Sequence, residues 1–507
     1  MAQAPKRRGR QARLAQSSII AAPAKLRRLI PPYAPFPQSD IDQLEAQADW
    51  LLEDIGIDFR GDAEALSYLD AAGAKITDER VRFPQGLTRQ LCQTAPQQFD
   101  LHARNPDKTV TLGGDYLVLM PGYGSPFVTD LDQGRRYATL CDFENFVRLA
   151  YMSPYLHHSG GTVVEPTDVP VSKRHLDMVQ AHLTLSDKPF MGSVTEPHRA
   201  EDSLAMAQIV FGDQMDTDAV IQANINVNSP MVYDATMTGV LKAYAKAGQC
   251  VCISPAIFGG AMGPVTPAAM AAQTHAELMA GIALTQVIRP GCPVVYGSFH
   301  NTMSLKSGAL TFGTPEANLV IFALGQLARQ LGVPFRSGGG QITGANAADG
   351  QAMAESVAAM WATVMSGTHQ VWHAAGWLEG GLTMGYEKFV MDLDACGAIL
   401  KMVGGMDVSP ESLSKASYRQ VGPGGNFLST DHTMAHFADA NFEPSISEAG
   451  PYETWAEQGS RSSEERANTR WREMLSSYAP PALDAGIAAE LEGFVADRKA
   501  ALKDEWY

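Results

Sequence analysis

The feature that most constrains the fold is a repeat in which a short apolar run ends in glycine and polar residues and then leads into a long alanine-rich segment. Three such runs between Cys292 and Asp394 read PVVYGSFHNTM, VPFRSGGGQIT and HQVWHAAGWLEGG. Short apolar runs bounded in this way are typical of buried strands, and the segments between them have the apolar spacing of helices. Strand, loop and helix in this order predict parallel strands, with polar residues gathered after the strand ends.

The same order extends upstream and predicts eight strands in all. They are expected at 117–128, 155–164, 189–195, 219–227, 249–258, 293–299, 333–339 and 370–376. Helices are expected at 172–187, 199–212, 231–247, 266–288, 315–331, 349–367 and 386–403. Eight strands close a barrel, and no G-x-G-x-x-G follows an early strand, which argues against an open doubly wound sheet. We therefore predict an α/β protein, a (β/α)8 TIM barrel with helical extensions at both ends.

The chain outside the repeat divides into further regions. We predict a basic N-terminal arm at 1–35, a helical N-terminal extension at 36–104, the barrel at 105–440 and a C-terminal helical extension at 441–507. The first 29 residues hold eight Lys and Arg and no acidic residue. Three interpretations of this arm are open: a partly disordered tail, an arm that docks on an acidic neighbouring subunit, or a transit peptide.

Composition and charge exclude several classes of function. With 45% hydrophobic and 19% charged residues, the 507-residue chain has the composition of a globular protein. A net charge of -16 argues against a nucleic-acid partner, which needs a basic surface. No apolar run approaches the roughly 20 residues of a membrane span. Six thinly spread cysteines fit a reducing compartment, so we expect a cytoplasmic location and no membrane partner.

Polar, charged and aromatic residues gather after the expected strand ends, where a parallel barrel places its active site. Rings and acids together suit a methylated ammonium, which cannot donate hydrogen bonds and is held by ring faces and negative charge. For any one aromatic residue the alternative is core packing, and for Arg336 it is an ordinary ion pair. The candidate residues are Tyr123, Glu165, Glu196, Asn226, Tyr296, Phe299, Arg336, His373 and Trp377.

Histidine spacing does not predict a catalytic metal. His369 and His373 are four residues apart, but Gln-Val-Trp between them indicates a strand, on which the two rings lie too far apart to share an ion. We expect no metal site. His373, which directly precedes Ala-Ala-Gly, is the best candidate for a functional histidine, and the alternative is a structural one.

Longer segments resemble the trimethylamine methyltransferase family over nearly the whole chain. They read GTPEANLVIFALGQLARQLGVPFRSGGGQITGANAADGQAMAES, VWHAAGWLEGGLTMGYEKFVMDLD, GGNFLSTDHTMAHF, YETWAEQG and, near the start, RRGRQAR. The resemblance implies a barrel enzyme that moves a methyl group from a methylated amine to the cobalt of a corrinoid carried by a separate small protein. Archaeal trimethylamine enzymes of the family carry pyrrolysine, expected near the 340s here, where this chain has only standard residues. The chain is therefore similar to the non-pyrrolysine branch, whose known type is the glycine betaine methyltransferases.

This resemblance assigns roles to the candidate residues. A quaternary amine such as glycine betaine is the expected methyl donor, the Co(I) corrinoid of a partner protein is the acceptor, and no tightly bound cofactor is expected. His373, Glu165 and Glu196 are the catalytic candidates, and Arg336 is expected to pair with a substrate carboxylate. The substrate-binding candidates are Tyr123, Asn226, Tyr296, Phe299, Arg336 and Trp377. We also expect a homo-oligomer.

Two other functions are compatible with the residues. One is a non-catalytic or regulatory barrel that binds a methylated amine without turnover. The other is a barrel lyase or hydrolase that uses Glu165 and Glu196 as an acid–base pair.

Overall fold

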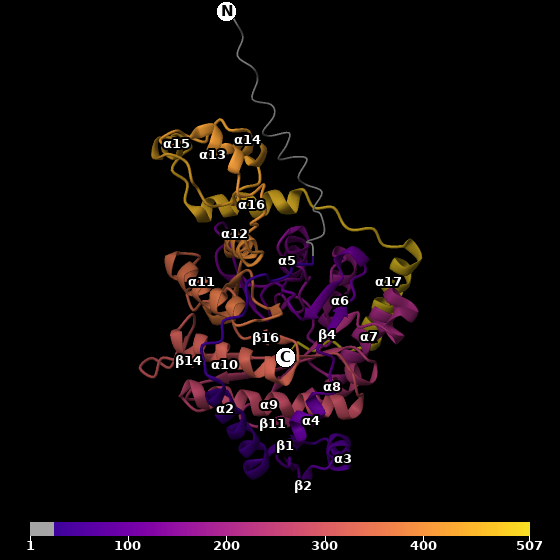
Figure 1. Ribbon diagram of the computed structural model, residues 1–507. Helices are drawn as coiled ribbons and strands as arrows, with labels where there is room; N and C mark the ends of the chain where they lie inside the picture. The colour runs from indigo at the N-terminus through magenta and orange to yellow at the C-terminus, as the bar shows by residue number, and fades with distance from the viewer. Residues whose placement is uncertain (1–24, 507) are drawn as a thin grey trace, which may run out of the picture.

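The computed structural model describes residues 25–506, in which helices surround a central parallel sheet (Figure 1). Seven strands follow one another in the order β9–β10–β12–β13–β16–β17–β6, and every neighbouring pair is parallel. Each lies in one of the predicted strand segments, which confirms seven of the eight. Their bounds are β6 Val118–Leu119, β9 Phe190–Met191, β10 Ile221–Val227, β12 Cys250–Phe258, β13 Val294–Gly297, β16 Phe335–Ser337 and β17 Gln370–Val371.

The remaining prediction, a regular strand at 155–164, is wrong. Gly160 has a φ of 97°, which a regular strand cannot contain. The segment still bonds to both edges of the sheet: the His157 N–H donates to the Leu119 carbonyl of β6 (2.8 Å), and the Met191 N–H of β9 donates to the Gly160 carbonyl (2.9 Å). One irregular segment therefore links β6 to β9.

A helix follows each strand, and the predicted helices are confirmed with small differences at their ends. The largest is at α8, which begins four residues later than expected because Asp234 caps it through the Met237 N–H. The helix after β6, α5, was not predicted. The bounds are α5 Leu140–Met152, α6 Arg174–Leu185, α7 Pro197–Phe211, α8 Ala235–Lys246, α9 Pro267–Ile288, α10 Pro315–Leu331, α11 Gly350–Met365 and α12 Tyr386–Val403.

The N-terminal extension packs against α9. Because α9 lies between the sheet and this extension, it is buried on nearly all sides, which suits its alanine-rich sequence. The extension contains strands in addition to the expected helices. Its elements are α2 Gln38–Trp50, β1 Ile57–Arg60, α3 Ala63–Ala71, β2 Lys75–Thr77, β3 Arg80–Arg82, α4 Leu87–Cys92 and β4 Gln98–Leu101; β1 pairs with β11 Val232–Asp234, and β4 with β5 Val110–Gly113.

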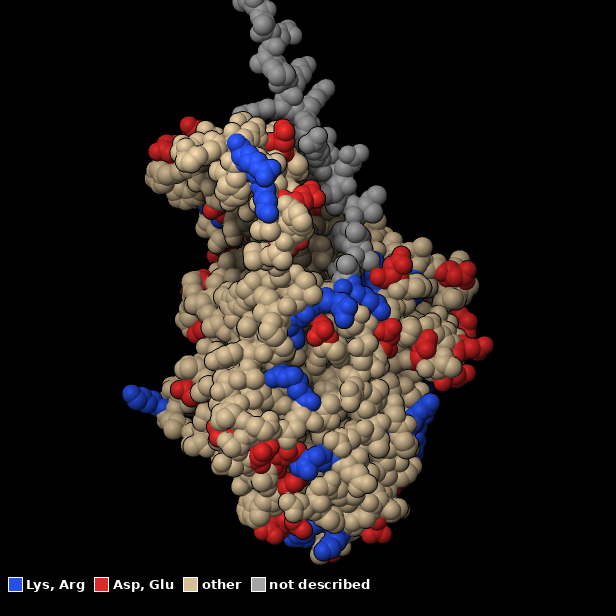
Figure 2. Space-filling view, viewed as in Figure 1, with Lys and Arg blue, Asp and Glu red and all other residues tan. Residues whose placement is uncertain are grey.

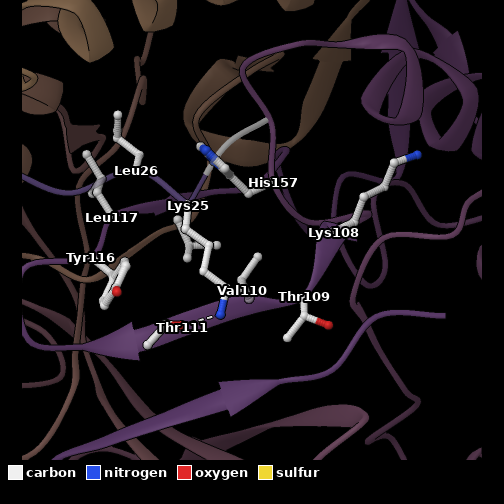
Figure 3. A pocket seen from close by; sticks show the side chains of 10 residues that line it. Lys25, Leu26, Lys108, Thr109, Val110, Thr111, Tyr116, Leu117 and His157 are labelled. Carbon is white, nitrogen blue, oxygen red and sulfur yellow. Dashed lines mark hydrogen bonds between the residues drawn. The ribbon is translucent and has the colours of Figure 1, made fainter. Parts of the chain in front are cut away.

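The last part of the basic arm packs on its own chain. The Leu117 N–H donates to the Leu26 carbonyl, and the Arg28 N–H donates to the Asp115 carbonyl. At a small pocket between this segment and β5, the Lys25 ammonium donates to Thr111 Oγ1 at 3.0 Å (Figure 3). The rest of the predicted arm lies outside the described residues.

The C-terminal part wraps the outside of the helical layer. Helix α16 packs on α12 and α5, and α17 packs on α6 and α7. Residues 404–460, called the lobe below, project from the end of α12 at the opposite side of the molecule from α2 and α3 (Figure 1). The helices are α13 Lys415–Val421, α14 Asp431–His436, α15 Tyr452–Glu457, α16 Ser463–Ser476 and α17 Ala485–Ala501. Within residues 25–506, no helix is both long and apolar enough to cross a membrane.

A buried lysine holds the irregular segment in place of regular strand pairing. The Lys188 ammonium, just before β9, donates to the carbonyls of Ala150 (2.9 Å), Ser153 (3.0 Å) and Leu156 (2.6 Å). Three carbonyls at and just after the end of α5 are thereby satisfied in the interior.

We predict that Lys188→Met lowers the free energy of unfolding by about 3 kcal/mol or more, because it leaves these buried carbonyls without a donor. Urea denaturation followed by circular dichroism measures the loss. The control is Lys401→Met at an exposed position, which should change stability by less than about 0.5 kcal/mol. Equal effects of the two substitutions would contradict the role given to Lys188.

Candidate active site

Arg336 of β16 is the centre of a buried cluster at the carboxyl ends of the strands. Its guanidinium donates to Ser254 Oγ of β12 (3.0 Å), to the Ser298 carbonyl after β13, and to His373 Nε2 after β17 (3.2 Å). The Trp372 ring lies 4.2 Å from its central carbon. Arg336 and its partners come from four consecutive strands of the sheet, β12, β13, β16 and β17, so the topology of the sheet brings them together.

The guanidinium has no acidic partner within the described chain. Arg336 is 2% exposed, and no Asp or Glu of residues 25–506 forms an ion pair with it. Burial lowers its pKa to about 10, still well above neutrality. An uncompensated buried charge costs several kcal/mol, of which a ring face offsets only part. The arrangement therefore favours an anion supplied from outside the chain.

His373 is neutral, and its tautomer follows from its contact with Arg336. Burial and the nearby guanidinium hold its pKa well below its ordinary value. Since Arg336 donates to Nε2, that nitrogen is the acceptor and the proton lies on Nδ1. Nδ1 is buried without a partner, and the backbone has a φ of 55°, rare for residues other than glycine. His373 therefore presents one free N–H donor.

Further donors in the same cluster lack partners. The Nε of Arg336 and the indole nitrogens of Trp372 and Trp377 are buried without an acceptor in the described chain. The Trp377 ring lies 4.1 Å from the His373 ring, and Trp372 lies 6.5 Å from it. Buried polar groups are rarely left unpaired, so several free donors in one cluster indicate a ligand that accepts several hydrogen bonds.

Aromatic rings form the remaining surface of the cluster. The Phe299 ring lies 5.7 Å from His373 and 5.8 Å from Trp377, and the Tyr123 ring lies 5.6 Å from Trp372. Burial raises the pKa of Tyr123 to about 12, so its hydroxyl stays protonated. Ring faces next to a set of donors can hold a molecule that is cationic at one end and anionic at the other.

The glycine loop at 338–344 fits between the strand ends because it lacks side chains. A Cβ on Gly339 would overlap Thr363 Oγ1, and a Cβ on Gly340, which has a φ of 127°, would overlap the Trp372 carbonyl. The Gln341 N–H donates to the His373 carbonyl at 2.8 Å. The loop therefore locks the end of β16 to the segment after β17.

A fully buried ion pair on α12 stabilises this loop. Lys388 and Asp392 of α12 are paired, with both side chains 0% exposed. Asp392 accepts from the Gly376 N–H at 2.9 Å, its carbonyl accepts from Gln341 Nε2 at 2.6 Å, and Lys388 also donates to Ser356 Oγ at 3.0 Å. The pair thus fixes both the glycine loop and the turn after His373.

The two predicted carboxylates lie outside this contact network. Glu165 forms an ion pair with Arg174 at the start of α6; burial raises its pKa, and Arg174 opposes that shift. Glu165 is near enough to Tyr123 to raise the pKa of that phenol. Glu196 is the residue before α7, whose Ala200 N–H donates to its carbonyl.

The other two predicted residues also differ in placement. Tyr296 shares a hydrogen bond of 2.9 Å with His275 of α9 and packs in the core between sheet and helices, so it does not lie beside Arg336. Asn226 pairs in register with Ser254 on the neighbouring strand, and its side chain is exposed and accepts from Asn224 at 3.2 Å. The structure therefore groups Tyr123, Phe299, Arg336, His373 and Trp377.

Several residues of the cluster were not among the predicted site residues. Ser254, Ser298 and Trp372 contact Arg336, and Lys388 and Asp392 support the loop. The last two carried a detectable signal, because opposite charges four residues apart within a mostly apolar helix indicate an ion pair. Among residues 25–506, no three His, Cys, Asp or Glu side chains group closely enough to hold a metal.

We predict that Lys388→Met lowers the free energy of unfolding by about 3–5 kcal/mol, because it leaves Asp392 buried without a counter-ion. Urea denaturation measures the effect. The matched control is the double variant Lys388→Met with Asp392→Leu, which removes both charges and should recover a large part of the loss. A double variant less stable than the single one would contradict this account.

Comparison with known proteins places the chain among methyltransferases. A family model described as trimethylamine methyltransferase (MTTB) matches residues 5–503. The chain is 40% identical over 480 residues to the glycine betaine methyltransferase of Desulfitobacterium hafniense (strain Y51), covering 94% of this chain and 100% of that protein. It is 28% identical over 406 residues to the proline betaine:corrinoid methyltransferase of Eubacterium limosum, covering 77% and 82%.

The crystal structure of the Methanosarcina barkeri monomethylamine methyltransferase (MtmB) is 10% identical in sequence, with a TM-score of 0.46, and covers 87% of this chain and 93% of that chain.

Proposed function

The chain belongs to the trimethylamine methyltransferase family and is a methyltransferase, and we propose that it takes a methyl group from glycine betaine or a related carboxylate-bearing quaternary amine. The acceptor in this proposal is the Co(I) corrinoid of a separate protein. Relatives named for glycine betaine and proline betaine support the class of donor.

The observation that carries the substrate assignment is the buried, unpaired guanidinium of Arg336. A betaine brings the carboxylate that this charge lacks, whereas trimethylamine and choline do not. The free donors on His373 Nδ1, Trp372 and Trp377 supply further hydrogen bonds to the same carboxylate. The ring faces of Phe299 and Trp377 are then available for the trimethylammonium end.

In the proposed reaction, Co(I) attacks one methyl carbon, the carbon–nitrogen bond breaks, and its electron pair stays on nitrogen as a tertiary amine. The substrate loses its positive charge in this step, so tight binding of that charge would oppose the reaction. The carboxylate keeps its charge throughout. Anchoring by Arg336 and His373 therefore holds the substrate without penalising the transition state, and it orients one methyl group.

The proposal also includes the closure of the sheet and the division of the chain into regions. We propose that the sheet closes into a (β/α)8 barrel through residues 156–160, since hydrogen bonds join this segment to both β6 and β9. The regions at 1–35, 36–104, 105–440 and 441–507 are the proposed division. In this proposal the Arg336 cluster binds the amine, and the corrinoid is assigned to the partner protein. A cytoplasmic location and a homo-oligomeric state stay predictions.

The function is tested by incubating the full chain with Co(I) cobalamin and glycine betaine and following methylcobalamin by absorbance. Carnitine, proline betaine and choline are run in parallel. We expect methylation of cobalt with one or more of the carboxylate-bearing amines and little with choline. No methylation with any of the four compounds would overturn the proposal.

We predict that Arg336→Met weakens binding of glycine betaine by about 100-fold, roughly 3 kcal/mol, because the carboxylate loses its buried charge partner. Isothermal titration calorimetry measures the affinity. Binding of choline, which has no carboxylate, should change far less. Arg470→Met, at an exposed position on α16, is the control. Unchanged betaine affinity in Arg336→Met would contradict the proposed anchor.

A further inference from the structure

The lobe, residues 404–460, exposes an unusual amount of apolar surface. Nine of the 21 large apolar side chains that are exposed in the described chain lie in these 57 residues. Ile446 is the one apolar residue of the lobe that is buried. The exposed residues are Met406, Val408, Leu413, Tyr418, Phe427, Leu428, Met434, Phe437 and Tyr452.

The lobe contains few internal contacts that could stabilise its fold. Its helices α13, α14 and α15 have 7, 6 and 6 residues, and helices this short are unstable in water unless they are packed. Its links to the rest of the chain include hydrogen bonds from Ser445, Ile446 and Ser447 to Asp394, and packing of Phe442 near Tyr155. Ordering 57 residues costs far more conformational entropy than one buried apolar side chain offsets, so we expect another surface to cover the lobe.

The charge of the lobe indicates which surface fits it. The lobe has eight Asp and Glu against Lys415 and Arg419 alone, and Figure 2 shows carboxylates scattered over a mostly neutral surface there, with one basic patch. Residues 1–24 have the opposite character, with five Lys and Arg, no acidic residue, and the apolar residues Leu14, Ile19 and Ile20. The two segments are complementary in charge, and both offer apolar side chains.

The described end of the arm, at Leu29, contacts the start of the lobe. The Leu29 N–H donates to the Val403 carbonyl at 2.8 Å, and the Leu29 side chain packs over Gly405, where the lobe begins. Lys25 is anchored on β5 (Figure 3), so residues 1–24 start from a fixed point on the same chain. Twenty-four residues can extend to about 80 Å, which is enough to reach a lobe of this chain or of a neighbouring copy.

We propose that residues 1–24 dock on the lobe and cover its apolar surface. Basic side chains of the arm pair with the carboxylates of the lobe, and Leu14, Ile19 and Ile20 pack against the exposed apolar residues. Because surface charge pairs are screened by ions, the docking is expected to weaken as salt concentration rises.

Lys6 allows a direct test, since it is the single lysine in residues 1–24. A zero-length carbodiimide joins a lysine amine to a carboxylate it touches, so treatment of the full chain followed by peptide mass spectrometry should link Lys6 to acidic residues between 404 and 460. The matched control is Lys6→Arg, which keeps the charge and should lose these links. Mixing isotope-labelled and unlabelled chains shows whether the arm covers its own lobe or that of another copy.

Links from Lys6 that spread over the whole surface, or none to the lobe, would overturn the proposal. A second measurement is independent of cross-linking. Hydrogen exchange of α13, α14 and α15 should be at least several-fold faster in a variant lacking residues 2–24 than in the full chain, while exchange at α9 should stay the same. Equal exchange of the lobe in both proteins would also refute the docking.

Discussion

The buried guanidinium of Arg336 is the charge on which the arrangement of the site depends. In the described chain its acceptors are neutral, namely Ser254, the Ser298 carbonyl and His373, so its lost hydration is only partly replaced. The large cores between the sheet and its surrounding helices supply the stability that tolerates this cost. In the proposed function, the carboxylate of the substrate offsets this cost when it binds.

The same charge determines what His373 can do. By donating to Nε2 and by disfavouring a second positive charge, Arg336 leaves His373 neutral with its proton on Nδ1. A neutral donor suits the proposed reaction, because breaking a bond between carbon and a quaternary nitrogen needs no proton transfer. His373 therefore fits a role in positioning the substrate, and the proposed reaction needs no acid from Glu165, which is paired with Arg174.

Most of the sheet and its helices could be predicted because, from residue 172 onward, long segments with helical spacing alternate with short apolar runs; α5, which precedes this region, was missed. The segment at 155–164 could not be predicted, since its apolar residues resemble a strand while Gly160 adopts a φ of 97°. Its order depends on Lys188, which donates to carbonyls 32 to 38 residues earlier in the chain, and no local pattern reveals these contacts.

The sequence predicted the residues of the site only where it also predicted the end of a strand. His373, two residues after β17, forms a hydrogen bond with Arg336, and the Trp377 ring packs on His373. Neighbouring residues of a strand face opposite sides of the sheet. Phe335 and Tyr296 therefore pack against α9 and the helices beside it, whereas Arg336 lies on the other face of the sheet. A shift of one residue in the assumed strand exchanges these faces. Sequence patterning therefore identifies the strand that contributes to a site more securely than the side chain that does.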